Sequence, residues 1–434
     1  MDPHITEWLN LSIRWVHMIV GVAWIGASFY FVWLENNLNR VDPKTGLSGD
    51  LWAIHGGGIY HLEKYKLAPP KMPEHLHWFK WEAYFTWITG VCLLFVVYYL
   101  NANIYLIAPG SGLSVGAAIG IGVGSLIGGW VAYTLLCDSP LGKKPLLLGV
   151  VLFACLVGAA YGLSQVFSGR GAYIHVGAII GTIMVGNVFF IIMPAQRNLV
   201  KAIEDGTEPD PRLPAKGLLR SRHNNYLTLP VLFIMISNHF PSTYGSEYNW
   251  LILAALSVFS ILVRHYFNTR HGSQKFAWAV PVAVLGMICL AFVTSNKMPS
   301  LSQPSAPVAQ VSSSASSATS ETANTSGDTA EAADPAATQD DEEGKAAAAP
   351  SVFTQVQGVI KERCVECHSA TPTSNMFASA PAGVVLDTPE EIKTNAPRIQ
   401  AQVQTKVMPL GNLTKMTDAE RDLVVTWVSN GAQL

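Results

Sequence analysis

Two cysteines and a histidine in the last fifth of the chain have the spacing of a covalent haem site. Cys364 and Cys367 are separated by two residues, and His368 follows directly. This arrangement attaches haem c, because the two thiols add to the haem vinyl groups and the adjacent imidazole binds the iron. A thioredoxin-like redox pair would need a βαβ context, which the surrounding sequence lacks. The motif therefore predicts haem c with His368 as an iron ligand.

The second iron ligand is expected well downstream of this motif. Met408 is the preferred candidate, and a thioether ligand raises the potential, which suits an electron acceptor. Met376 and Met416 compete with it. Met376 is close to the motif, and Met416 directly precedes Thr417, the expected N-cap of a terminal helix over about 418–431.

Histidines also occur inside long apolar segments nearer the N-terminus. His17 and His175 lie near the ends of two such segments. Polar side chains at membrane depth are costly and usually functional. Two imidazoles on facing helices would hold a b-type haem, so the sequence predicts His17 and His175 as its ligands. Hydrogen bonding between helices is the alternative interpretation.

A third group of chemically active residues lies between the first two apolar segments. Residues 52–61 combine aromatic rings, three consecutive glycines, His55 and His61. Such a segment can approach a planar polar ligand closely. It could equally form a re-entrant turn without a ligand, and the spacing allows both.

The elements that carry these residues are mostly membrane spans. Half of the 434 residues are hydrophobic and only 13% are charged. A bilayer core needs about 20 mostly apolar residues per helical span. Eight segments meet this requirement, and the sixth is the weakest because it is short and contains a proline: 11–34, 79–100, 113–136, 145–166, 172–194, 225–240, 249–267 and 276–294.

The basic residues of the loops orient these spans. Most of the loop lysines and arginines fall on one side, which the positive-inside rule assigns to the cytoplasm. They include Arg40, Lys44, Lys64, Lys66, Lys71, Lys143, Lys144, Arg197, Lys201, Arg212, Lys216, Arg220, Arg222, Arg270 and Lys275. An even number of spans then predicts a bacterial inner-membrane protein with both termini in the periplasm, where haem c is attached. No basic region is large enough for nucleic acid.

Three regions follow: a membrane domain over 1–298, a disordered acidic linker rich in Ser, Ala and Pro over 299–350, and a small periplasmic cytochrome c domain over 351–434. The predicted fold class is all-α, with a polytopic helix bundle in the membrane. Segments that begin at Lys80 and Arg222 share a base, then a tyrosine and then a threonine at equal spacing. Either a four-plus-four duplication or chance similarity of apolar helices explains this.

Three segments of the membrane domain resemble the bacterial membrane-bound urate hydroxylases. They are His-Gly-Gly-Gly-Ile-Tyr-His at 55–61, the stretch at 72–84 with its His-Trp-Phe-Lys-Trp-Glu-Ala-Tyr run, and His-Asn-Asn-Tyr-Leu-Thr-Leu-Pro at 223–230. Members of this family have eight spans followed by a cytochrome c domain, and the resemblance covers the whole chain.

The resemblance implies oxidation of urate to 5-hydroxyisourate, with water as the oxygen source. Electrons would pass to haem c and on to a soluble cytochrome c or terminal oxidase. A base must take up the proton, and the candidates are His55, His61 and Glu82, with Asn224 orienting the substrate. Lys80 or Arg222 would attract the anion. Because these residues are cytoplasmic and haem c is periplasmic, an intermediate cofactor such as haem b is expected between them.

Two other functions fit the same features. A quinol–cytochrome c oxidoreductase would depend on quinone and would not respond to urate. A transporter with a fused redox domain would show substrate flux without turnover.

Overall fold

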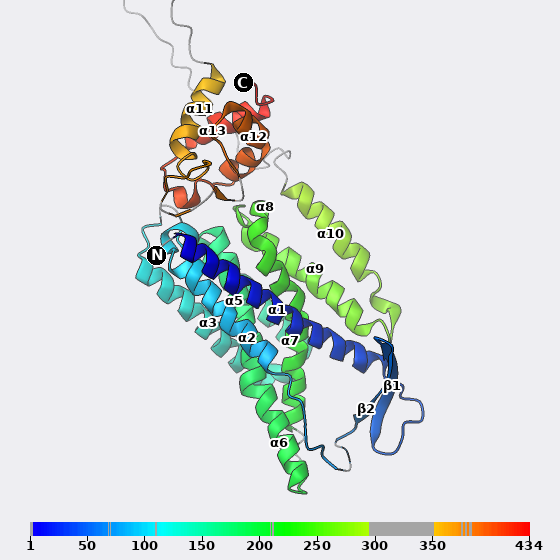
Figure 1. Cartoon of the computed structure of the whole chain (residues 1–434). Coiled ribbons are helices and arrows are strands. Elements are labelled where there is room, and N and C mark those ends of the chain that lie inside the picture. The colour runs from blue at the N-terminus through cyan, green and yellow to red at the C-terminus, as the bar shows by residue number, and fades with distance from the viewer. Residues whose placement is uncertain are drawn as a thin grey trace, which may run out of the picture.

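The structure, a computed structural model, describes residues 3–294 and 351–434 apart from 68, 70, 109–110, 209, 211, 375, 378–379 and 382–383. These residues form a long helical bundle and a smaller helical unit at one end of it (Figure 1). The predicted linker, 299–350, lies outside the described residues.

The bundle contains the helices of the first 294 residues. They are α1 (Pro3–Asn37), α2 (Trp81–Leu93), α3 (Val115–Asp138), α4 (Pro145–Val166), α5 (Gly169–Gly186), α6 (Met193–Glu204), α7 (Arg212–Ile236), α8 (Pro241–Tyr244), α9 (Asn249–Thr269) and α10 (Ala279–Val293). Three π-helical segments are η1 (Leu94–Tyr99), η2 (Ala102–Leu106) and η4 (Asn187–Ile192). Three 3-10 turns are η3 (Pro140–Lys143), η5 (Ser237–His239) and η6 (Gln274–Phe276).

Most of these helices are long and apolar enough to cross a membrane. Among the described residues, seven helical stretches qualify, and they coincide with seven of the eight predicted spans. The remaining predicted span, 225–240, falls on the second half of α7, whose first half is basic. The chain is therefore a membrane protein with an all-α polytopic bundle, as the sequence predicts.

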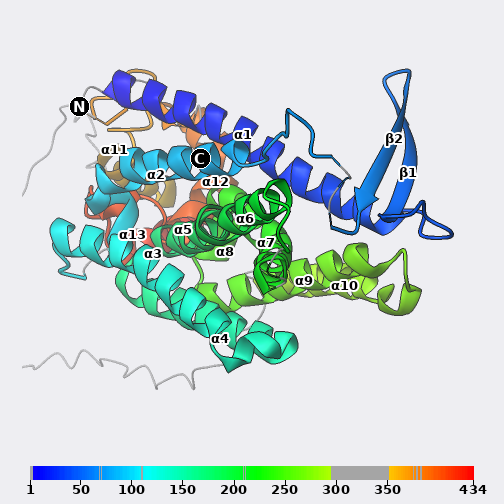
Figure 2. The same ribbon diagram turned by 90° about the horizontal axis from the view of Figure 1, so that it is seen from below.

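Helix α5 lies at the centre of the bundle, in contact with α2, α3, α4 and α7 (Figure 2). Tyr173, His175 and Ile180 on this helix are fully buried. Helix α3 approaches α5 closely because a glycine faces it: a Cβ added at Gly129 would lie 2.7 Å from the Ile179 side chain. Glycine at such a contact lets helices pack at short range within a membrane.

One helix pairing is common to the two halves of the bundle. Helices α1 and α2 form one packed pair, and α5 and α7 form another. Each pair consists of the helices that carry the first two predicted spans of its half. The duplication itself stays a prediction, but this pairing is the one that a duplication would produce.

The loop after α1 forms a β-hairpin, which the sequence analysis did not anticipate. Strands β1 (Leu47–His55) and β2 (Gly58–Tyr65) pair antiparallel. Gly56 and Gly57 form the two-residue turn, with φ of 59° and 81°. Two consecutive residues with positive φ match the right-handed twist of a hairpin, and glycine adopts them without steric cost. The three glycines at 56–58 thus serve a tight turn.

The C-terminal unit has its own apolar core. It contains α11 (Val352–Arg363), α12 (Pro389–Gln404), the short turn η8 (Leu410–Asn412) and α13 (Asp418–Ser429). The rings of Phe353 and Trp427 lie 5.6 Å apart and join the first and last helices. Thr417 and Glu420 form a capping box at the start of α13, which confirms the predicted cap.

This unit contacts the bundle through η8. Turn η8 packs on η2, and Val407 packs against the main bundle core. Gly411 has φ of 58°, and a Cβ added there would lie 2.8 Å from the Asn103 carbonyl oxygen. The segment that follows Met408 therefore lies directly against the end of the bundle.

Candidate functional site

The hairpin carries two of the predicted catalytic residues. His55 is exposed at its turn. His61 is half-buried, with its Nε2 atom 2.8 Å from the Asp50 carboxylate and its ring stacked 4.2 Å from that of Trp52. The hairpin projects from the bundle at the end opposite the C-terminal unit (Figure 1). The structure therefore does not bring His55 and His61 together with Asn224.

The other predicted polar residues lie near the basic end of the bundle. Glu82 is half-buried in the first turn of α2. The Nζ atom of Lys80 lies 5.5 Å from the centre of the Trp81 ring. Arg222 is exposed on α7. Within the described part of the chain, no hydrogen bond or ring contact links these residues to Asn224.

Asn224 belongs to a buried polar network that joins α3, α5 and α7. Its Nδ2 atom donates to the Met184 carbonyl at 2.9 Å. Its Oδ1 atom accepts from Asn187 Nδ2 at 2.8 Å, and Asn187 also donates to the Tyr133 hydroxyl at 2.9 Å. The Tyr133 hydroxyl is 2.8 Å from Nδ1 of His223. We call Tyr133, Asn187, Arg220, His223 and Asn224 the inner polar cluster.

Arg220 supplies the positive charge of the inner polar cluster. Its side chain is fully buried, and one Nη2 hydrogen bond of 2.8 Å reaches the Asp138 carboxylate. Its Cζ atom lies 4.9 Å from the centre of the Tyr133 ring. Its Nε and Nη1 atoms have no hydrogen-bond partner among the described residues. Leaving such donors unpaired in a protein interior is costly, so water or a small polar ligand would suit them.

The inner polar cluster combines the groups that recognise a planar amide anion. A guanidinium with free N–H groups binds negative charge, a carboxamide pairs with ring amide edges, and an aromatic ring stacks. Tyr133 and His223 form a hydrogen-bonded pair through which a proton can move. The arrangement can therefore orient a small heterocyclic anion and take a proton from it.

The two histidines predicted to share a haem lie in different surroundings. His17 lines a cavity between α1, α2, α5 and α7. His175 is fully buried, with Nδ1 2.8 Å from the Gly171 carbonyl and Nε2 3.2 Å from the Tyr99 hydroxyl. It is not among the residues that line this cavity. The structure therefore does not present both imidazoles to one space.

Two local features of the haem c motif are compatible with covalent attachment, its free thiols and the tautomer of His368. Cys364 and Cys367 follow α11 and are not bonded to each other. Nδ1 of His368 must donate to the Val384 carbonyl, 2.9 Å away, because a carbonyl can only accept. The proton is thereby fixed on Nδ1, and Nε2 keeps a lone pair for iron. The residues fit the group.

The Cys364 thiol does not have the properties of a dithiol redox catalyst. Burial, with a smaller contribution from Cys367, raises the pKa of Cys364 to about 12. Reactive cysteines in Cys-x-x-Cys redox motifs have a lowered pKa instead, because the thiolate is the nucleophile. This observation disfavours the thioredoxin-like alternative.

Residues 3–295 match the protein family described as urate oxidase N-terminal. This chain belongs to that family. Neither the comparison with curated proteins nor the comparison with solved structures gives a match.

Membership of the urate oxidase N-terminal family indicates an oxidoreductase that acts in urate oxidation. The matched region includes the whole bundle, the inner polar cluster and the cavity beside His17. The C-terminal unit lies beyond it. The family relationship therefore concerns the part of the chain that holds the buried Arg220.

Sequence reasoning identified Asn224 but missed Arg220, Tyr133 and Asn187. One signal was available: Arg220, His223 and Asn224 are spaced by three and four residues and so share one face of a helix. The sequence contained no such signal for Asn187. This residue begins the π-helical segment η4, and a π-bulge is not visible in the sequence. Such bulges occur frequently at functional sites.

Met408 and Met416 differ in surroundings, which allows a direct test of the second haem c ligand. Met416 is 3% exposed in the core of the C-terminal unit. Met408 is half-buried, and Arg421 donates to its carbonyl at 2.6 Å. We expect Met408→Leu to lower the haem c potential by on the order of 100 mV, within the roughly 0.8 V that axial ligands span. Met416→Leu keeps core volume and should leave the potential unchanged in a redox titration.

Proposed function

We propose that this protein oxidises urate to 5-hydroxyisourate with water and passes the electrons to haem c in its C-terminal unit. Membership of the urate oxidase N-terminal family carries the proposal. The free N–H groups of the buried Arg220 supply an anion site within the matched region. A soluble cytochrome c or a terminal oxidase would then accept the electrons.

The reaction balances as urate and water giving 5-hydroxyisourate, two protons and two electrons. Loss of two electrons leaves an electrophilic purine carbon, and the water oxygen forms the new bond to it. Arg220 would hold the anion and Asn224 would pair with an amide edge. The Tyr133 hydroxyl would take the proton from water while passing its own to Nδ1 of His223. Haem c, when bound, supplies the electron acceptor.

In this proposal the inner polar cluster faces the cytoplasm of a bacterium and the C-terminal unit faces the periplasm. The basic loops support this orientation by the positive-inside rule. Asp138, the partner of Arg220, is the last residue of α3, whereas η2, which contacts the C-terminal unit, precedes the first residue of α3. The two sites therefore lie at different ends of the bundle. The role of His55, His61 or Glu82 as the catalytic base stays a prediction. The position of the two histidines on the hairpin does not favour this role for them.

One experiment tests the function directly. Urate is added without oxygen to the purified full-length protein, and the absorbance of haem c is followed. Reduction with formation of 5-hydroxyisourate supports the proposal. An unreduced haem c in a folded protein contradicts it. Reduction by a quinol but not by urate would support the quinol–cytochrome c oxidoreductase, and urate flux into vesicles without reduction would support the transporter.

The contact at Gly411 provides a prediction about electron transfer. Gly411→Ala should slow reduction of haem c by urate about tenfold, because the added Cβ pushes η8 away from the Asn103 carbonyl and small displacements strongly reduce rates. Gly431→Ala is the matched control. Gly431 also has positive φ, at 93°, but its Cβ would meet only Gln433, at 3.8 Å. Equal rates in the two variants would show that this contact does not matter for transfer.

A further inference from the structure

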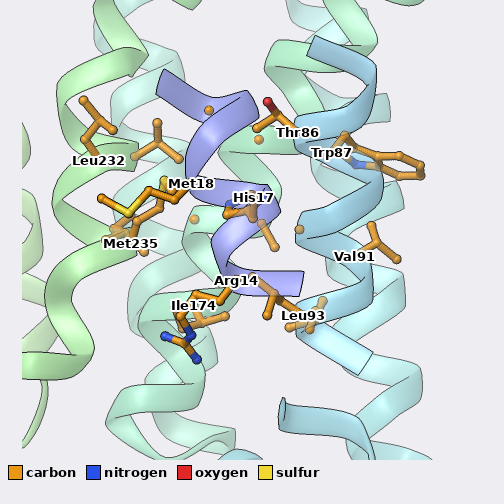
Figure 3. A pocket seen from close by; sticks show the side chains of 18 of the residues that line it. Arg14, His17, Met18, Thr86, Trp87, Val91, Leu93, Ile174, Leu232 and Met235 are labelled. Atoms are coloured by element: carbon orange, nitrogen blue, oxygen red, sulfur yellow. The ribbon is translucent and has the colours of Figure 1, made fainter. Parts of the chain in front are cut away.

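A partly open cavity in the middle of the bundle is separate from the inner polar cluster. Its volume is about 400 Å³, and α1, α2, α5 and α7 enclose it (Figure 3). Most of its lining is apolar. Four of the lining residues are glycines: Gly21, Gly90, Gly177 and Gly181. A Cβ added at Gly21 or Gly181 would meet nothing within 4 Å, so these walls leave room for a flat molecule.

His17 lines this cavity, and a hydrogen bond fixes its tautomer. Its Nδ1 atom lies 2.9 Å from the Thr89 hydroxyl, and that hydroxyl donates its own hydrogen to the Phe85 carbonyl at 2.6 Å. The hydroxyl must therefore accept from Nδ1–H, which leaves the lone pair on Nε2. A hydrogen bond that fixes the tautomer in this way is the usual support of a metal-binding histidine.

The opposite wall and the outer end of the cavity supply further groups. Met235 of α7 lies across the cavity from α1, near the level of His17 (Figure 3). Arg14 precedes His17 by three residues and so lies one turn nearer the C-terminal unit on the same face of α1. Arginine is the residue best suited to bind a carboxylate. His239 also lines the cavity near this end.

The cavity lies between the two ends of the proposed reaction path. On its inner side, Met184 lines the cavity and accepts a hydrogen bond from Asn224. On its outer side, Tyr98 lines it and accepts from Nε of Arg170 at 3.2 Å. The Arg170 guanidinium lies 4.7 Å from the centre of the Tyr105 ring, on the segment η2 that contacts the C-terminal unit.

We propose that this cavity holds one b-type haem, with His17 and Met235 as iron ligands and the propionates directed toward Arg14. The proposal rests on the proposed function for its role, which is to connect the inner polar cluster with haem c. His17 is retained from the pair expected from the sequence. Met235 replaces His175, whose Nε2 lies against Tyr99 and Gly122 outside the cavity.

The test needs no urate. Full-length protein is purified in detergent, and non-covalent haem is extracted and identified by its pyridine haemochrome beside the covalent haem c. We expect equal amounts of the two. His17→Gly should lose at least about nine-tenths of the extractable haem, and added imidazole should restore it. The matched control, His175→Gln, should retain it. Haem c content and elution volume check that each variant is folded.

The other possible results test the presence of the haem, its ligands and the proposed function separately. Wild-type protein without extractable haem, or with a quinone in its place, overturns the proposal, as does full haem retention in His17→Gly. Met235→Leu should keep the haem but alter its spectrum. An altered spectrum in His239→Gln instead would overturn Met235 as the ligand. If the haem is present but urate reduces neither haem, the proposed function fails while this inference stands.

Discussion

Replacing Arg220 by methionine is expected to reduce kcat/KM for urate by about 100-fold, measured as anaerobic reduction of haem c. Methionine fills much of the same space but removes the charge and the N–H groups that would meet the substrate anion. Losing a hydrogen bond between a charged group and its partner in a buried site costs roughly 3 kcal/mol, which corresponds to this factor. The variant should also bind urate more weakly, which a titration of the oxidised protein would show.

Structural damage from this replacement should be modest, since Asp138 does not lose its only partner. Lys216 lies 3.0 Å from the same carboxylate. The matched control is Arg222→Gln, which removes an exposed arginine two residues away and should change kcat/KM less than twofold. A Lys80→Gln variant tests the other predicted attractor. If Arg222→Gln and Arg220→Met behave alike, the anion site is not where we place it.

Much of the fold was readable from the sequence because it depends on local chemistry. Long apolar segments predict spans, since a bilayer leaves helices as the only way to satisfy backbone groups in one segment. The helix cap at Thr417 was also predictable from local sequence, because its partner Glu420 is only three residues away. The haem c motif is likewise contained in five consecutive residues.

What the sequence analysis missed depends on contacts between distant residues. The sequence left open whether the three glycines at 56–58 approach a ligand or form a re-entrant turn, and two of them have the positive φ of a hairpin turn. Arg220 was counted as one more basic loop residue. Only the side-chain contacts between α3 and α7 reveal that it is buried beside Tyr133. His175 was chosen because it lies near the end of an apolar segment, but the Tyr99 hydroxyl beside its Nε2 belongs to a residue 76 positions away.

The same distinction explains why the candidate site changed. A helix period places His223 and Asn224 near Arg220, yet it does not say which neighbour completes the group. Asn187 does so from η4, where the π-helical turn brings its carboxamide to both Tyr133 and Asn224. The unpaired N–H groups of Arg220 become apparent only when the hydrogen bonds of its neighbours from other helices are known.

Replacing Cys364 and Cys367 by alanine is expected to abolish urate-dependent reduction of an external cytochrome c while leaving the bundle intact. Haem c could then no longer be attached. The Cys364 side chain packs at the edge of the C-terminal core and Cys367 is half-buried, so the remaining apolar residues should hold this core together. Full transfer to the external acceptor in this variant would place the exit of electrons elsewhere.

The same double variant separates urate chemistry from electron exit. The inner polar cluster and the central cavity contain neither cysteine, so urate binding should be unchanged within about twofold, and any non-covalent haem should still be present. Without an exit, we expect urate to cause a single partial turnover and then no further product. A Cys289→Ala variant, which alters an exposed cysteine of α10, should transfer electrons at the wild-type rate. Because the proposed path has an entry in the bundle and an exit in the C-terminal unit, only the exit should depend on these two thiols.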